Sequence, residues 1–139
     1  MSDVEYIIET TDLSKSYGPH LALENLNLKV RQGATGLLGP NGAGKSTFLK
    51  TILGLIQATS GHGTVLGHDI RTEGAAIRSR IGYMPEYDAL NPDMEAIHQV
   101  KYSGELLGMN PIVAMSRAHE VLQYVGLGEQ RYRLSLIHI

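Results

Sequence analysis

Residues 39–47 read Gly-Pro-Asn-Gly-Ala-Gly-Lys-Ser-Thr and satisfy the spacing G-x-x-x-x-G-K-[ST], which is typical of loops that bind phosphate groups. Glycines have no Cβ atom, so such a loop can curl tightly and turn successive backbone N–H groups toward one anion. A helix that begins at Lys45 would add its N-terminal N–H groups and its positive dipole end at the same place. The pattern therefore predicts a triphosphate-binding site.

The polar side chains of this loop have distinct expected roles. Lys45 should reach the β- and γ-phosphates, and the Ser46 hydroxyl should ligate Mg²⁺. Thr47 is placed to donate a hydrogen bond near the α-phosphate. The residues expected to contact a bound nucleoside triphosphate are Tyr17, Gly39, Pro40, Asn41, Gly42, Ala43, Gly44, Lys45, Ser46 and Thr47. The alternative is a glycine-rich turn that precedes Lys-Ser by chance.

Composition narrows the class of protein. A chain of 139 residues with 42% hydrophobic and 19% charged residues is large enough for one globular domain. Its net charge of −2 predicts no nucleic-acid partner. The absence of cysteine excludes disulfides and thiolate metal sites. The sequence has no run of 18 apolar residues, so it predicts no membrane span. The acidic N-terminus does not resemble a secretory signal.

Strand patterns surround the loop in the N-terminal half. We expect strands over 4–10, 21–30, 35–38 and 63–67, with a turn at Gly18-Pro19. A helix is expected over Lys45–Ile56, burying Phe48, Leu49, Ile52, Leu53, Leu55 and Ile56. One or two helical turns over 72–79 and a short β segment over 80–84 should follow. Tyr17, just before the turn, could stack on a base or simply pack.

From Tyr87 onward the sequence becomes helical. One helix should open at Asn91-Pro92 and stop at Gly108, with Lys101 and Glu105 forming a weak pair. A second should be capped by Asn110-Pro111 and end before Gly126. Its apolar side is expected to comprise Val113, Ala114, Ala118, Val121, Leu122 and Val125. The expected division is a nucleotide-binding core over 1–87 and a helical subdomain over 88–130.

The order of these parts resembles the N-terminal part of an ABC-transporter ATPase subunit. Residues 13–18 are similar to that family's adenine-stacking loop, with Tyr17 as the stacker, and residues 39–47 to its Walker A. Gly61–Gly67 is similar to the hairpin that follows, and residues 81–86 to the entrance of the Q-loop. The resemblance, which runs over 1–133, implies an α/β fold: a P-loop NTPase with a mixed β core and an α-helical subdomain.

Glu86 departs from the family pattern, which usually has Gln at this position. A carboxylate there would still ligate Mg²⁺. The resemblance implies a catalytic role for Lys45 and Glu86, and Mg²⁺ ligation by Ser46 and Glu86. Glutamate in this context is similar to the ATPases of ABC-2 type exporters. The alternative is that Glu86 only caps a strand and faces solvent.

The family's signature motif and Walker B are not found in residues 1–139, and no acidic residue follows a run of four apolar residues. Leu134-Ser-Leu-Ile-His-Ile139 is what the transposon end of sequencing-library adapters encodes in one frame. We therefore expect 134–139 to be a non-native tail, the alternative being a natural terminal strand. Without a Walker B strand beside it, segment 35–38 should leave an apolar edge exposed.

For the full-length parent, the resemblance implies ATP hydrolysis that drives transport, with ATP and Mg²⁺ as cofactors. The implied partners are a second ATPase subunit, as a homodimer, and membrane permease subunits. The implied location is cytoplasmic, on the inner face of the cell membrane through the permease. Two alternatives stay open: a soluble ABC ATPase without a membrane partner, and an inert truncated fragment that binds nucleotide at most.

Overall fold

The computed structural model describes residues 6–85 and 90–134. The chain forms two compact units, Met1–Gly82 and Tyr83–Ile139, which are called here the N-terminal and C-terminal units. The division lies a few residues before the boundary expected at 87, and residues 86–89 lie outside the described part. Each unit is described by itself.

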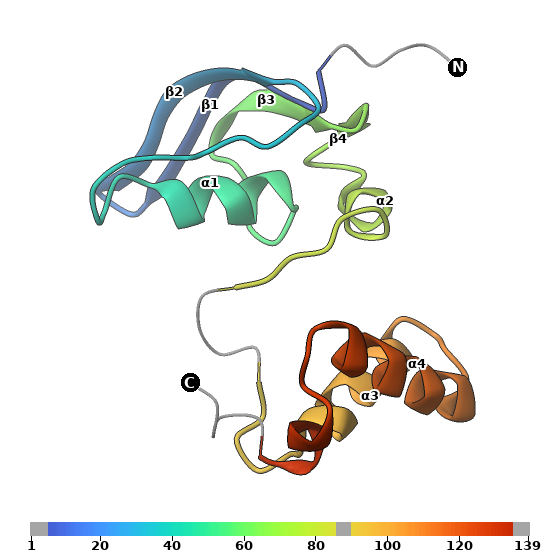
Figure 1. Cartoon of the computed structure of the whole chain (residues 1–139). Coiled ribbons are helices and arrows are strands. Elements are labelled where there is room, and N and C mark those ends of the chain that lie inside the picture. Colours follow the sequence, from blue (N-terminus) through green and yellow to red (C-terminus); the bar gives the residue numbers. More distant parts are fainter. Residues whose placement is uncertain (1–5, 86–89, 135–139) are drawn as a thin grey trace. The chain divides into compact units, whose positions relative to one another are not determined.

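An antiparallel sheet with strand order β2-β1-β3-β4 forms the N-terminal unit together with two helices (Figure 1). Its strands are β1 (Ile8–Tyr17), β2 (His20–Val30), β3 (Ser60–Val65) and β4 (His68–Asp69). The strand predicted over 21–30 and the turn at Gly18 are confirmed, and β2 pairs with β1 in antiparallel orientation. The apolar sides of these elements meet in one core.

Strand β1 is longer than predicted, and residues 13–17 belong to it rather than to a loop. The alternation breaks because the ladder between β1 and β2 has a bulge between Thr10 and Leu13. Asp12 there has a positive φ of 49°, and its backbone N–H donates to Asn27 Oδ1 at 3.0 Å. Asn27 Nδ2 donates in return to Asp12 Oδ1 at 3.0 Å. The side chains of the two strands thus stabilise the bulge.

Helix α1 (Lys45–Ile52) is shorter than the predicted 45–56. Gly54, with φ 64°, ends it: Gly54 N–H donates to Thr51 O and Leu55 N–H to Lys50 O, which is the Schellman arrangement. Phe48, Ile52 and Leu53 are buried as predicted. The prediction was wrong for the exposed Leu49 and Leu55, because the helix stops before Leu55 and Leu49 lies on its outer side.

Two predicted strands, 35–38 and 80–84, do not form. A strand needs a neighbour that accepts its backbone hydrogen bonds, and no described segment pairs with either stretch. Leu37 and Leu38 are 44% and 93% exposed, so apolar side chains are exposed here as expected, but they lie on an irregular segment and not on the edge of a strand. Figure 1 shows the chain between β2 and α1 as a tube without regular secondary structure.

The short helix α2 (Gly74–Arg78), predicted within 72–79, is tied to β4 at its start. The Asp69 carboxylate accepts from the N–H groups of Arg71 and Thr72 at 2.8 and 3.0 Å, which lowers the pKa of Asp69. The Glu73 carboxylate contacts His68 Nδ1 at 2.9 Å and accepts from Asp69 N–H at 2.8 Å, and these contacts lower the pKa of Glu73. Both carboxylates are therefore held ionised where α2 begins.

The C-terminal unit is a helical hairpin of α3 (Ala96–Leu106) and α4 (Pro111–Tyr124), followed by the 3₁₀ helix η1 (Glu129–Tyr132) (Figure 1). Helix α3 begins later than the predicted Asn91. The Asn91 side chain accepts from Asp93 N–H at 3.0 Å, and this turn delays the helix. Gly108, with φ 87°, follows α3 as predicted, and the Lys101–Glu105 pair is confirmed at 3.1 Å.

Helix α4 begins as its sequence predicted. The Asn110 side chain accepts from Ile112 N–H at 2.9 Å, and Pro111 occupies the first helical position. Ala114, Ala118 and Leu122 are buried, and Ala118 and Leu122 pack with Ile97 of α3. The valines predicted on this side are exposed, because the contact with α3 is narrow (Val113, Val121, Val125). No helix in the described ranges is long and apolar enough to cross a membrane.

Candidate phosphate-binding site

The loop that precedes α1 contains two glycines in left-handed conformations. Gly42 and Gly44 have φ values of 84° and 83°, a region that favours glycine. Ala43 N–H donates to Pro40 O at 3.2 Å, which closes one turn of the loop. Residues 39–43 are exposed, and α1 begins immediately afterwards at Lys45. The loop thus stands open to solvent at the positive end of a helix.

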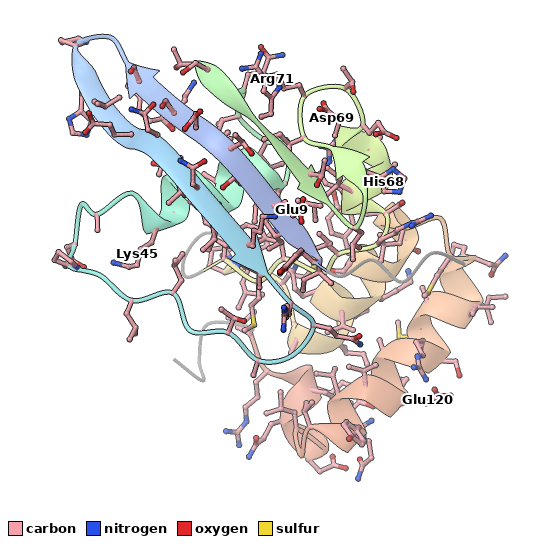
Figure 2. All side chains as sticks on the ribbon, turned by 90° about the horizontal axis from the view of Figure 1, so that it is seen from above. Glu9, Lys45, His68, Asp69, Arg71 and Glu120 are labelled. Atoms are coloured by element: carbon pink, nitrogen blue, oxygen red, sulfur yellow. The ribbon has the colours of Figure 1, made fainter. Side chains whose placement is uncertain are left out.

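Lys45 folds back over this loop. Its Nζ donates to Gly39 O at 2.6 Å and to Pro40 O at 2.8 Å. Figure 2 shows the side chain pointing into the curve of the loop. Because an ammonium forms stronger hydrogen bonds with a charged phosphate oxygen than with a neutral carbonyl, Lys45 is positioned to exchange these partners for an incoming phosphate.

Gly44 is pressed against β2, a contact that the sequence did not reveal. A Cβ atom on Gly44 would overlap Ala22 O and would lie 2.9 Å from Leu23 Cδ2. The loop and this part of β2 are separated by about twenty residues, so no local pattern predicts the contact. Strand β2 therefore forms the wall against which the last residue of the loop rests.

We expect Gly44→Ala to destabilise the N-terminal unit more than Gly42→Ala does. The two glycines have nearly equal φ values, so alanine at either costs about 1–2 kcal/mol of backbone strain. A Cβ on Gly42 meets nothing within 4 Å, whereas one on Gly44 meets β2. The overlap should lower the free energy of unfolding by about a further 1–3 kcal/mol. Urea unfolding of the two variants measures this difference, and equal losses would contradict the contact.

Ser46 and Thr47, the two hydroxyl residues of the motif, occupy the first turn of α1. Ser46 is exposed, whereas Thr47 is half-buried and its carbonyl accepts from Thr51 Oγ1 at 2.7 Å. Phe48 N–H donates to Gly44 O at 2.8 Å, so the helix is regular from its first residue. The exposed Ser46 hydroxyl at this end is free of burial and available to a cation.

Tyr17 lies at the end of β1 and is 47% exposed. Lys15 Nζ lies 5.0 Å from the centre of its ring, which is a cation–π contact. Its cross-strand partner is His20, two residues from Ala22, so Tyr17 lies about 7 Å along the strand direction from the point where Gly44 meets β2. The exposed ring and the phosphate loop are thus both at this end of the sheet.

The remaining predicted site residue, Glu86, lies outside the described residues. The strand expected just before it is not formed over 81–85. In the described ranges, no group of three or more His, Cys, Asp and Glu side chains could hold a metal ion. His68 lies in β4, and its Nδ1 contacts the Glu73 carboxylate at 2.9 Å.

The family model of the ABC transporter matches residues 23–136. The chain belongs to the ABC transporter family. It is 38% identical over 125 residues to the linearmycin resistance ATP-binding protein LnrL of Bacillus subtilis, covering 89% of this chain and 40% of that protein. It is 36% identical over 128 residues to the daunorubicin/doxorubicin resistance ATP-binding protein DrrA of Streptomyces peucetius, covering 91% and 39%.

Solved structures show the same fold. The ATP-binding cassette MJ0796, a dimer in a post-hydrolysis state bound to ADP and Pi, matches with a TM-score of 0.76 at 23% identity, over 95% of this chain and 62% of its own. An ATP-binding subunit of an ABC transporter matches with a TM-score of 0.72 at 26% identity, over 92% and 54%. The ABC ATPase fold expected from the sequence is confirmed. The chain spans about two fifths of the length of the curated relatives named here.

Proposed function

We propose that this chain binds MgATP through residues 39–47. The observation that carries the proposal is the placement of the Lys45 ammonium inside a loop whose Gly42 and Gly44 adopt left-handed conformations. A positive charge and a helix N-terminus lie at this loop, and its left-handed glycines would let backbone N–H groups turn toward the same anion. The name of the MJ0796 structure, which reports bound ADP and Pi, supports the same ligand class.

Different residues of the site would contact different parts of the nucleotide. Lys45 would exchange the two loop carbonyls for the β- and γ-phosphates, and the N–H groups of the loop residues other than Pro40 would surround the phosphates. Ser46 and Glu86 would hold Mg²⁺, which neutralises charge that develops on the transferred phosphoryl group. The exposed Tyr17 ring stacks on the adenine.

In the full-length parent, this site serves an ATPase that drives export. The names of the relatives support this: one is a Nod factor export ATP-binding protein of Cupriavidus metallidurans, 35% identical over 122 residues, and others are resistance ATP-binding proteins. The parent would pair with a second ATPase subunit and act on permease subunits at the cytoplasmic face of a membrane. The division into a nucleotide-binding core and a helical subdomain belongs to this proposal, as does the non-native origin of residues 134–139.

The 139-residue chain should bind ATP without hydrolysing it at a useful rate. Lys45, Mg²⁺ and the loop amides supply charge neutralisation, but the sequence contains no Walker B glutamate to orient the attacking water. Phosphate release is measured beside equilibrium binding of a fluorescent ATP analogue. If the wild-type chain hydrolyses ATP and Lys45→Ala does not, the expectation that the 139-residue chain is inactive is wrong.

If the wild-type chain does not bind the ATP analogue, the proposed function is wrong, and the alternative of an inert fragment remains. Neighbouring genes distinguish the exporter from a soluble ABC ATPase. Permease genes beside the complete reading frame support export.

A further inference from the structure

We infer that Arg78 is a positioning residue for the phosphate-binding helix, an inference that rests on the ATP binding proposed above. Arg78 Nη1 donates to Leu53 O at 3.1 Å and to Gly54 O at 3.3 Å. Both carbonyls lie immediately beyond the C-terminal end of α1. Arg78 therefore holds the end of α1 that is opposite to Lys45 and the phosphate loop.

The two carbonyls have no donor within the helix itself. The Schellman turn that ends α1 provides N–H donors for Lys50 O and Thr51 O but none for the carbonyls that follow. Among the described backbone hydrogen bonds, neither Leu53 O nor Gly54 O accepts one. The guanidinium supplies the donor, and its positive charge complements the negative end of the helix dipole.

The fit between α1 and α2 is built around this contact. A Cβ on Gly54 would lie 3.1 Å from Gly74 Cα and 3.3 Å from Arg78 Nη1, and one on Gly74 would lie 2.9 Å from Arg78 Nη1. Two glycines thus leave the space through which the guanidinium reaches the end of α1. No other residue type fits at either position without a shift of the arginine or of the backbone.

Helix α2, which carries Arg78, is held in place by contacts with β4 and with the core. Its start is tied to β4 by the carboxylates of Asp69 and Glu73, and the fully buried Ile77 packs in the same core as Phe48 and Ile52 of α1. Helix α1 is about 12 Å long, so a tilt of about 5° at its C-terminal end moves the N–H groups at the other end by about 1 Å. Displacements of that size disturb phosphate recognition.

Binding of an N-methylanthraniloyl ATP with Mg²⁺ to the 139-residue chain tests the inference, at a temperature where circular dichroism shows each variant folded. Arg78→Met, which keeps the length but not the donors, should raise the Kd about three- to tenfold. Arg78→Lys, which keeps the charge and one donor, should recover part of the loss. Arg71→Met is the control: it removes the same charge beside Asp69 (Figure 2), and its Kd should equal that of the wild type.

Phosphorus NMR of bound ATP separates positioning from general stability. A displaced helix moves the resonance of the β-phosphate in Arg78→Met, whereas mere destabilisation of a still folded protein does not. If Arg78→Met does not fold, Arg78→Lys carries both measurements. If the wild-type chain binds ATP and the Arg78 variants show the same Kd and the same β-phosphate resonance, the inference is wrong but the proposed function stands. A wild-type chain that does not bind ATP would overturn the proposed function and this inference with it.

Discussion

Lys45→Ala should raise the Kd for MgATP by roughly 10- to 150-fold, because it removes a charge-assisted contact worth about 1.5–3 kcal/mol. The Lys45 ammonium already lies within the loop, donating to Gly39 O and Pro40 O. No large rearrangement is needed to bring it onto the phosphates. The loss should therefore appear as weaker binding and not as slower association. Equilibrium titration with a fluorescent ATP analogue measures it.

The matched control is Lys50→Ala, which removes the same charge from the last turn of the same helix. Lys50 is exposed and lies about one and a half turns from Lys45, so its loss should change the Kd by less than about twofold. Both variants should unfold at nearly the same urea concentration as the wild type. Equal effects of the two substitutions would show that the loop attracts ATP only through general charge, and the proposed site would then be wrong.

Local signals in the sequence predicted their elements well, because the interactions that form them lie within a few residues. The glycine spacing of 39–44, the cap at Asn110-Pro111 and the stop at Gly108 all depend on neighbours along the chain. Each is present in the structure with the expected backbone conformation. For the same reason, the sequence predicted a phosphate-binding loop over 39–47 before any strand had been placed.

The errors lie where distant segments decide the outcome. Segment 35–38 has the apolar composition of a buried strand, yet composition does not supply the hydrogen-bonding neighbour that a strand requires. The bulge at Asp12 is stabilised by Asn27 from another strand, so alternation in β1 alone could not reveal it. The close contact between Gly44 and Ala22 likewise cannot be predicted from any local pattern.

Two isoleucine substitutions, one in each unit, should separate folding of the nucleotide site from folding of the helical hairpin. Ile77 is fully buried in the core of the N-terminal unit, and Ile97 is 2% exposed in that of the C-terminal unit. Replacing either by alanine removes the same atoms and should lower the free energy of unfolding of its unit by about 2–5 kcal/mol. That is a large part of the stability of so small a unit.

Only Ile77→Ala should weaken ATP binding, because Ile77 packs in the core that contains Phe48 and Ile52 of α1. Ile97 packs with Ala118 and Leu122, none of which belongs to the loop or to α1. Amide hydrogen exchange locates the loss of stability in each variant, and titration with the ATP analogue at low temperature gives the Kd. A rise in Kd for Ile97→Ala as large as that for Ile77→Ala would mean that ATP binding depends on the folding of both units, and the prediction would be wrong. An unchanged Kd for Ile97→Ala would show that ATP binding by this chain does not depend on the stability of the helical hairpin.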